Sequence, residues 1–204
     1  MSVGASQDGL KPESEEQARA DVYRLLGALL AGPPTAALLG MLRNITPAAD
    51  AVLEMPMTTA WQQLKVAAEQ VTPDRIEEEY FNLFIGMGRG ELVPYASYYV
   101  HGLLMEKTLA ALRSELGELG ITRRNGVAEP EDHVAAICEI MGMNISGHRL
   151  HLRQKAFFDS YIDPWMGRFF DDLGAAESAD FYRSVALLGQ QFLTVERQYF
   201  SLPA

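Results

Sequence analysis

Cysteine, basic residues and long apolar runs are all scarce in this chain. Only one of its 204 residues is a cysteine, Cys138, so an internal disulfide is excluded and a reducing compartment is indicated. No apolar run reaches the roughly 18 uninterrupted residues that a membrane-spanning helix requires. Lys and Arg number 17 against 27 Asp and Glu, a formal net charge of −10. This balance argues against nucleic acid as a partner, because such binding depends on cations that neutralise phosphates, and an acidic protein instead attracts basic partners.

The start of the chain lacks the pattern of a targeting sequence. Residues 1–11 contain no basic patch followed by an apolar segment, so we expect neither a secretory signal nor a transit peptide, and we expect a cytoplasmic location. Residues 1–13 are polar and contain Gly and Ser, which is typical of a disordered tail. Residues 14–204 are enough for one domain with a conventional core.

Apolar residues recur at helical spacing along most of the chain, and no segment shows a convincing strand-like alternation. A capping box at Ser14 and Gln17 begins the first expected helix, and Gly32-Pro33-Pro34 ends it. The longest expected helix covers 97–119 and ends at Gly120. The other expected helices cover 35–43, 48–55, 60–71, 73–86, a segment opened by Pro130, 154–161, a segment capped by Asp163-Pro164, and 178–199. We predict an all-α protein of about ten helices, with two helical subdomains joined near residues 120–129 as an alternative to one.

The segment Glu129-Pro130-Glu131-Asp132-His133 precedes an apolar-periodic run and has the composition of a helix beginning. Proline is favoured at the first helical position because its missing N–H would have no partner there, and acids are favoured at the positive end of the helix dipole. We therefore expect Pro130 to begin a helix, with Glu131, Asp132 and His133 in its first turn. Two roles stay open for Asp132 and His133: a structural helix terminus, or a polar anchor on a peptide-binding face.

Three tyrosines, Tyr95, Tyr98 and Tyr99, follow a glycine-containing loop at 86–90. Tyrosine combines apolar area with a hydroxyl at low entropic cost, so these side chains could line a binding groove. Core packing is the alternative for two of them. The loop lacks the Lys-Ser/Thr of a phosphate-binding loop and is interpreted as an interhelical turn.

The remaining reactive side chains predict neither catalysis nor a cofactor. His148 and His151 lie three residues apart, but no carboxylate or cysteine completes a metal site in the nearby sequence and the flanking arginines would repel a cation. Cys138 lies in an apolar-periodic stretch and is predicted to be a buried, inert thiol. The chain has no Gly-x-Ser-x-Gly turn to present a nucleophile. We therefore predict no catalytic residue, no metal and no bound cofactor.

Three segments together resemble the TorD/DmsD family of chaperones, which mature molybdoenzymes exported by the twin-arginine route. They are the pentad 129–133, the segment Tyr80-Phe81-Asn82-Leu83-Phe84-Ile85-Gly86, and the segment Val93-Pro94-Tyr95-Ala96-Ser97-Tyr98-Tyr99. The resemblance runs from about Ala18 to Glu196. The family usually has two prolines and an acid in the third segment, where this chain has one proline and Ala96. This departure leaves the client enzyme open.

The resemblance implies a cytoplasmic, non-catalytic chaperone that binds the twin-arginine signal peptide, the apo form of a molybdoenzyme, or both. The client would be of the dimethyl sulfoxide reductase type, such as trimethylamine oxide reductase, dimethyl sulfoxide reductase or formate dehydrogenase. Binding would assist cofactor insertion and delay export. The resemblance also assigns client binding to Asp132 and His133 and extends it to Glu129 and Glu131, and we add Tyr95 and Tyr98 to this candidate site.

Other functions stay open at this point. The chain could be a permanent assembly or scaffold subunit of a redox enzyme complex, and a metal- or nucleotide-dependent enzyme is a further alternative. Both a monomer and a domain-swapped homodimer are compatible with a helical protein of this kind.

Overall fold

The computed structural model describes residues 12–46, 55–102, 106–118, 120–121, 129–147 and 149–202. Within these ranges every regular element is helical, and the only β-type pairing among them is an isolated antiparallel bridge between Tyr95 and His133. The all-α prediction is therefore confirmed. The elements are α1 (Pro12–Leu30), α2 (Ala36–Arg43), α3 (Met55–Gln70), α4 (Pro73–Tyr80), the π-helical turn η2 (Phe81–Ile85), α5 (Ala96–His101), α6 (Glu106–Glu118), α7 (Val134–Ser146), α8 (His151–Tyr161), α9 (Met166–Ala175) and α10 (Phe181–Ser201).

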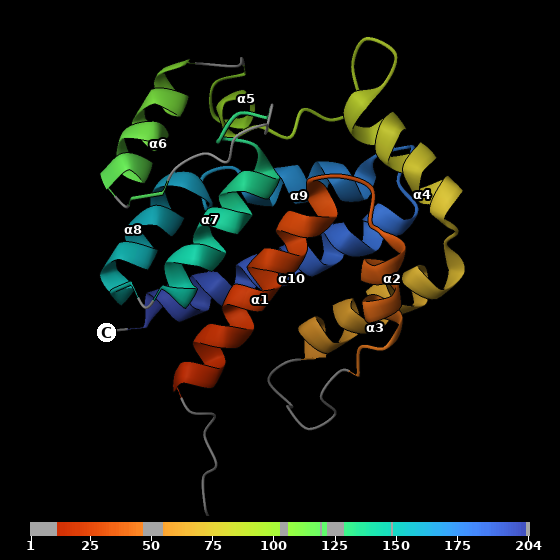
Figure 1. Ribbon diagram of the computed structural model, residues 1–204, viewed down its shortest axis with the longest axis horizontal. Helices are drawn as coiled ribbons and strands as arrows, with labels where there is room; N and C mark the ends of the chain where they lie inside the picture. Colours follow the sequence, from red (N-terminus) through yellow and green to blue (C-terminus); the bar gives the residue numbers. More distant parts are fainter. Residues whose placement is uncertain are drawn as a thin grey trace, which may run out of the picture.

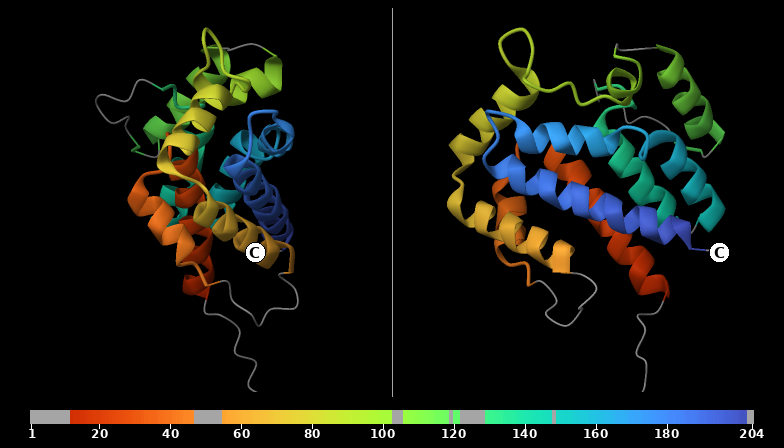
Figure 2. Two further views of the ribbon diagram at one scale, coloured as in Figure 1. Left: turned by 90° about the vertical axis from the view of Figure 1, so that its right-hand side faces the viewer. Right: turned by 180° about the vertical axis from the view of Figure 1, so that it is seen from behind.

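The helices pack around one core. Helix α1 crosses the molecule diagonally and lies along α7, while α10 packs against α9 and α3 on the other side (Figure 1). Seen from behind, α9 and α10 run side by side, and the chain after η2 arches over toward α5 (Figure 2). The largest fully buried side chains are mainly aromatic: Trp165, Tyr23, Tyr182, Phe157, Phe158, Phe169, Phe170 and Phe181. Burying each large apolar side chain contributes about 1.5–3 kcal/mol, so this cluster supplies much of the driving force for folding.

Two short helices begin as their sequences predict. Thr35 caps α2, and its hydroxyl accepts the N–H of Leu38 at 3.2 Å. Thr72 takes the cap position before α4, with Pro73 in its first turn. Both cases depend only on neighbouring residues, because a hydroxyl cap and a proline at the first position act locally.

The prediction of one long helix over 97–119 is wrong. Helix α5 ends at His101, because Gly102 takes a left-handed conformation with φ 75° that terminates the helix. Helix α6 then begins at Glu106, and the longest helix in the described ranges is α10, with 21 residues. Helical spacing of leucines continues across the break, so periodicity did not reveal it.

Three helix starts that were predicted from a cap or a proline are also displaced. Helix α7 begins at Val134 and not at Pro130, because residues 130–132 form a turn closed by the His133 N–H on the Pro130 carbonyl at 3.1 Å. Helix α9 begins at Met166 and not at Pro164, after a turn in which the Trp165 indole donates to the Tyr161 carbonyl at 2.6 Å. Helix α1 begins at Pro12, ahead of the expected Ser14 cap.

Some predictions fall outside the described residues. They are the tail up to residue 11, most of the helix over 48–55, His148, and most of the segment 120–129 that was considered as a link between subdomains.

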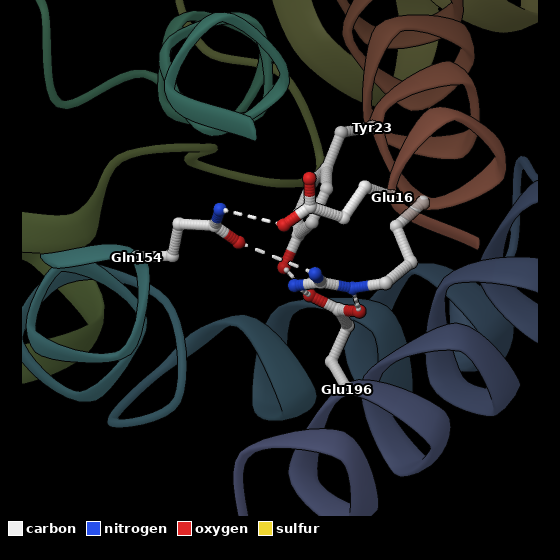
Figure 3. Close-up of polar contacts among 5 residues, drawn as sticks. Glu16, Tyr23, Gln154 and Glu196 are labelled. Atoms are coloured by element: carbon white, nitrogen blue, oxygen red, sulfur yellow. Dashed lines mark hydrogen bonds and ion pairs between the residues drawn. The ribbon is translucent and has the colours of Figure 1, made fainter. Parts of the chain in front are cut away.

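A buried polar cluster joins α1, α8 and α10. The Arg19 guanidinium donates to both carboxylate oxygens of Glu196, at 2.6 and 2.9 Å, and to Gln154 at 3.2 Å. The Tyr23 hydroxyl donates to the same carboxylate at 3.0 Å, and Gln154 also reaches Glu16 at 3.4 Å (Figure 3). Glu196 is fully buried, with 0% of its surface exposed. A buried charge is tolerated only when it is paired and hydrogen-bonded, and this cluster meets both conditions.

Candidate functional site

The predicted site forms where α5 and α7 begin. The carbonyl of Pro94 accepts the N–H of Val134 at 2.9 Å, and the carbonyl of Asp132 accepts the N–H of Ala96 at 2.9 Å. These reciprocal bonds hold the two helix starts together, and we call this region the α5–α7 junction (residues 94–98 and 129–134). It brings Tyr95, Glu129, Asp132 and His133 together as one cluster.

Asp132 is a capping residue for the neighbouring helix. Its carboxylate Oδ2 accepts the N–H of Ser97 in the first turn of α5 at 3.2 Å, and the residue is only 3% exposed. A carboxylate near a helix N-terminus satisfies an amide that has no helical partner and complements the dipole. Asp132 therefore acts first on the position of α5 and has little surface with which to contact a ligand.

His133 caps its own helix. It has extended backbone before α7, its Nδ1 accepts the N–H of Ala135 at 3.2 Å, and it is 6% exposed. Burial lowers the pKa of His133, although the nearby carboxylates of Glu129 and Asp132 act in the opposite direction. The cap requires a neutral imidazole with its proton on Nε2, because a protonated Nδ1 cannot accept a hydrogen bond.

Tyr95 links the junction to Glu129. Its ring meets the His133 ring edge-on with centroids 5.1 Å apart, and its hydroxyl donates to Oε2 of Glu129. Burial and this carboxylate both raise the pKa of the Tyr95 hydroxyl, so it remains a donor at neutral pH. Glu129 is exposed and Tyr95 is half-buried, so these two residues form the accessible side of the cluster.

Glu131 and Tyr98 point to other partners. Glu131 forms an ion pair with Arg113 of α6 at 2.9 Å. The Tyr98 hydroxyl accepts a hydrogen bond from Arg89 at 3.1 Å, and the guanidinium lies 5.5 Å from the Tyr98 ring centroid. Both residues are half-buried. The two arginines extend the junction toward α6 and toward the glycine loop, and neither was predicted as part of the site.

Tyr99 belongs to the core side of α5. Its hydroxyl donates to Asp172 at 2.9 Å, and its ring packs against Trp165 and Phe169 at 5.6 and 5.9 Å between centroids. Trp165 is itself 1% exposed, as expected for a core residue. The tyrosines of this segment are therefore divided between core and surface.

The glycine loop is folded tightly against η2. Gly86 has φ 60°, and a Cβ on Gly90 would lie 2.4 Å from the carbonyl carbon of Phe84, so only glycine fits there. The loop carries Met87, which is 99% exposed, beside the partly exposed Ile85. Sequence reasoning missed this apolar tip. The sequence feature that could have indicated it is the segment Phe81–Ile85, which has more apolar residues than one helix face can bury.

The other candidates of the sequence show no assembled chemistry. The described residues contain no group of three or more His, Cys, Asp or Glu side chains placed to hold a metal ion. His151 packs against the rings of Tyr199 and Phe200 at 5.2 and 5.4 Å between centroids. Cys138 is buried, as predicted, and burial raises the pKa of its thiol. In the described part of the chain, no helix has the length and apolarity needed to cross a membrane.

Comparison with known proteins gives consistent matches. The sequence model of the family described as nitrate reductase delta subunit matches residues 50–171. The Haemophilus influenzae protein named as Tat proofreading chaperone DmsD is 29% identical over 129 residues, which cover 62% of this chain and 63% of the relative. A TorD chaperone of Photobacterium profundum is 30% identical over 54% of this chain and 57% of its own length. A TorD chaperone of Shewanella loihica is 23% identical over 88% of this chain and 92% of its own length.

A solved structure shares the fold. The crystal structure of a protein described as a redox enzyme maturation protein from Archaeoglobus fulgidus superposes with a TM-score of 0.59, at 18% identity, over 95% of this chain and 99% of that one. The match to DmsD spans about three fifths of that relative's length, 63%. The family match covers residues 50–171, which is more than half of this chain and includes the glycine loop and the α5–α7 junction. The chain therefore belongs to the nitrate reductase delta subunit family, together with the TorD and DmsD chaperones of redox enzymes.

Proposed function

We propose that this protein is a cytoplasmic, non-catalytic chaperone that binds the twin-arginine signal peptide of a molybdoenzyme precursor. The observation that carries the proposal is the α5–α7 junction, where an exposed carboxylate, Glu129, stands beside partly exposed tyrosines in a chain of this family. Binding would shield the signal from export until the cofactor is inserted. The client is of the dimethyl sulfoxide reductase type.

Some residues of the junction contact the signal peptide in this proposal, and others position the helices. Glu129, Glu131, Tyr95 and Tyr98 are the candidate residues that retain accessible surface, so they meet the signal directly. Asp132 and His133 are buried caps that place α5 and α7. In this proposal their effect on binding comes through the position of α5.

The signal would be recognised by two kinds of interaction. Its short apolar stretch packs on tyrosine rings and on the exposed Met87 of the glycine loop, with about 1.5–3 kcal/mol for each well-buried large side chain. Its arginine pair meets Glu129, and an exposed ion pair contributes only about 0.2–1 kcal/mol. The apolar contacts therefore dominate affinity, while the charge selects among signals and speeds association.

Calorimetric titration with synthetic twin-arginine signal peptides tests the proposal, with a Sec-type signal as the control peptide. We expect selective binding with a negative heat-capacity change, which reports apolar burial. Glu129→Gln and Tyr98→Ala should weaken binding without changing the unfolding midpoint. Glu77→Gln, the same change at an exposed position of α4, is the matched control and should bind as the unaltered protein does. If no twin-arginine peptide binds more tightly than the Sec-type signal, the proposal is wrong.

A permanent assembly subunit is the second candidate, because the matching family is described as a subunit of a nitrate reductase. The two functions differ in stoichiometry. A subunit co-purifies with the mature enzyme in a fixed ratio, whereas a chaperone is recovered with the precursor and released before export. Quantitative pull-down of precursor and mature enzyme from the same cells separates them.

A further inference from the structure

A groove lies at the end of α7 farthest from the α5–α7 junction. It has a volume of about 600 Å³ and is lined by the last turns of α6 and α7 and the beginning of α8. Helix α7 has 13 residues, so at about 1.5 Å per residue its two ends are roughly 20 Å apart. The groove is therefore a separate surface from the proposed signal-binding site. We call it the α7–α8 groove, lined by Glu118, Gly120, Ile121, Met143, Asn144, Gly147, Arg149, Leu150 and Arg153.

Apolar side chains of the groove are left uncovered. Leu150 is 74% exposed and Met143 is 47% exposed, and Ile121, which also lines the groove, is half-buried against the core. Single exposed leucines are ordinary, but apolar residues gathered in one hollow are typical of an interaction surface.

The charge of the groove is opposite to that of the whole protein. The chain has a net charge of −10, yet two arginines, Arg149 and Arg153, stand among the groove residues against one acid, Glu118. The Arg153 guanidinium has no ion-pair partner within the described part of the chain. The groove also contains the N-terminus of α8, where the amide groups of the first turn favour a carboxylate. These features favour an occupant that carries acidic side chains.

Asn144 supplies an independent sign of a missing partner. The residue is 4% exposed and lines the groove, and its side-chain Oδ1 has no hydrogen-bond donor among the described residues. Buried polar side chains in folded proteins nearly always have a partner. A peptide N–H is the commonest donor that an occupant of this groove would bring.

We propose that the α7–α8 groove binds an acidic, apolar peptide segment of a partner protein. Apolar side chains of the segment pack on Leu150 and Met143, carboxylates meet Arg153, and a backbone N–H donates to Asn144. A second copy of this chain fits less well, because a groove that takes a different face of the next copy gives a head-to-tail contact, which forms an open filament unless the rotation closes a ring. This inference is independent of the proposed signal binding, since basic signals suit the other end of α7.

Peptide arrays test the proposal directly. One array carries hexapeptides that alternate Asp or Glu with Leu, Ile or Phe, and a second carries the same peptides with Lys or Arg in place of the acids. We expect the tightest acidic peptides to bind at least tenfold more strongly than their basic counterparts, measured by fluorescence polarisation. Leu150→Asp and Arg153→Glu should each weaken that binding about tenfold or more. Asn144→Ala should weaken it less.

Matched controls separate the groove from general charge and stickiness. Met41 of α2 is 64% exposed, so Met41→Asp makes the same type of change elsewhere, and Arg75→Glu does so for Arg153. Both controls should bind the acidic peptides normally, and Leu150→Asp should still bind a twin-arginine signal. Equal binding of the two arrays, or groove variants that bind like the unaltered protein, would overturn the proposal. Sedimentation would also overturn the proposal if it showed self-association that Leu150→Asp abolishes, because the groove would then bind a second copy of this chain.

Discussion

Removing one partner of the buried Arg19–Glu196 pair should destabilise the protein severely. Both carboxylate oxygens of Glu196 accept hydrogen bonds from Arg19, and one of them also accepts a bond from Tyr23. Arg19 is 4% exposed and Glu196 is 0% exposed. In Glu196→Ala the guanidinium therefore stays buried without its counter-charge, and Tyr23 loses its acceptor.

The expected cost follows from that geometry. Breaking a buried pair by removing one partner costs about 3–5 kcal/mol, whereas replacing both partners by apolar side chains of similar volume is often neutral or stabilising. We expect the double variant Arg19→Met with Glu196→Leu to lie within about 2 kcal/mol of the unaltered protein, because Gln154 and Tyr23 still lose a partner. For a chain of this length, a loss of 1 kcal/mol lowers the melting temperature by about 2–4 °C.

Urea unfolding followed by circular dichroism measures these free energies. The two single variants and the double variant form a cycle, and the coupling energy between the sites should exceed about 2 kcal/mol. Lys155→Met with Asp159→Leu serves as the control cycle, because that pair on α8 is solvent-exposed and should couple by less than about 1 kcal/mol. Single variants that each lose less than 1 kcal/mol would refute the reasoning, and so would a double variant that loses the sum of both.

Three further predictions concern the helix caps and the glycine loop. Burial lowers the pKa of His133 relative to the unfolded chain, so its contribution to stability is fully present above about pH 6.5 and is lost as the pH falls through the folded-state pKa. His133→Asn, a cap that does not titrate, should flatten the dependence of the unfolding free energy on pH between about pH 5 and 7. An unchanged pH dependence would contradict the assignment of His133 as the cap. The buried Glu79 carboxylate accepts three N–H groups at the beginning of α10, at 2.8, 3.1 and 2.8 Å. Glu79→Ala should therefore lower the unfolding free energy measured in urea by about 1–3 kcal/mol. A loss under about 0.5 kcal/mol would show that water replaces the cap. Gly90→Ala should destabilise the protein by more than about 1 kcal/mol, because its Cβ would lie 2.4 Å from the carbonyl carbon of Phe84. The control is Gly117→Ala in α6, where a Cβ meets open space, and it should be neutral or stabilising.

The sequence predicted which residues lie together at the α5–α7 junction, and their role in client binding stays a prediction. The pentad 129–133 does lie at a helix mouth, beside the tyrosine segment with which the resemblance grouped it. The helix start was predicted wrongly, because Pro130 closes a turn and α7 begins four residues later, at Val134. His133 provides the cap, which is the structural role left open for it. Capping preferences act locally and identify a helix end, but they do not specify which of several adjacent polar residues takes the cap position.

Arginine partners of the site could not be predicted. Arg89 reaches Tyr98 from the glycine loop, and Arg113 reaches Glu131 from α6. Long flexible side chains find partners only once the helices are placed, and their positions in the sequence carry no pattern that pairs them. The same holds for Asp132, whose carboxylate accepts the N–H of Ser97, 35 residues earlier in the chain.

By itself the sequence determined the all-α class and most helix positions, because apolar spacing, threonine caps and prolines act over a few residues. The resemblance of three segments to a known family indicated the membership that the comparisons confirm. The tertiary structure alone decided where helices break and which polar groups are buried. Val195 continues the helical spacing of Phe181, Val185, Leu188 and Phe192, but it is 37% exposed while the neighbouring Glu196 is fully buried. The reason is physical: a carboxylate enters a core only where a cation meets it, and that cation, Arg19, lies 177 residues away in the sequence.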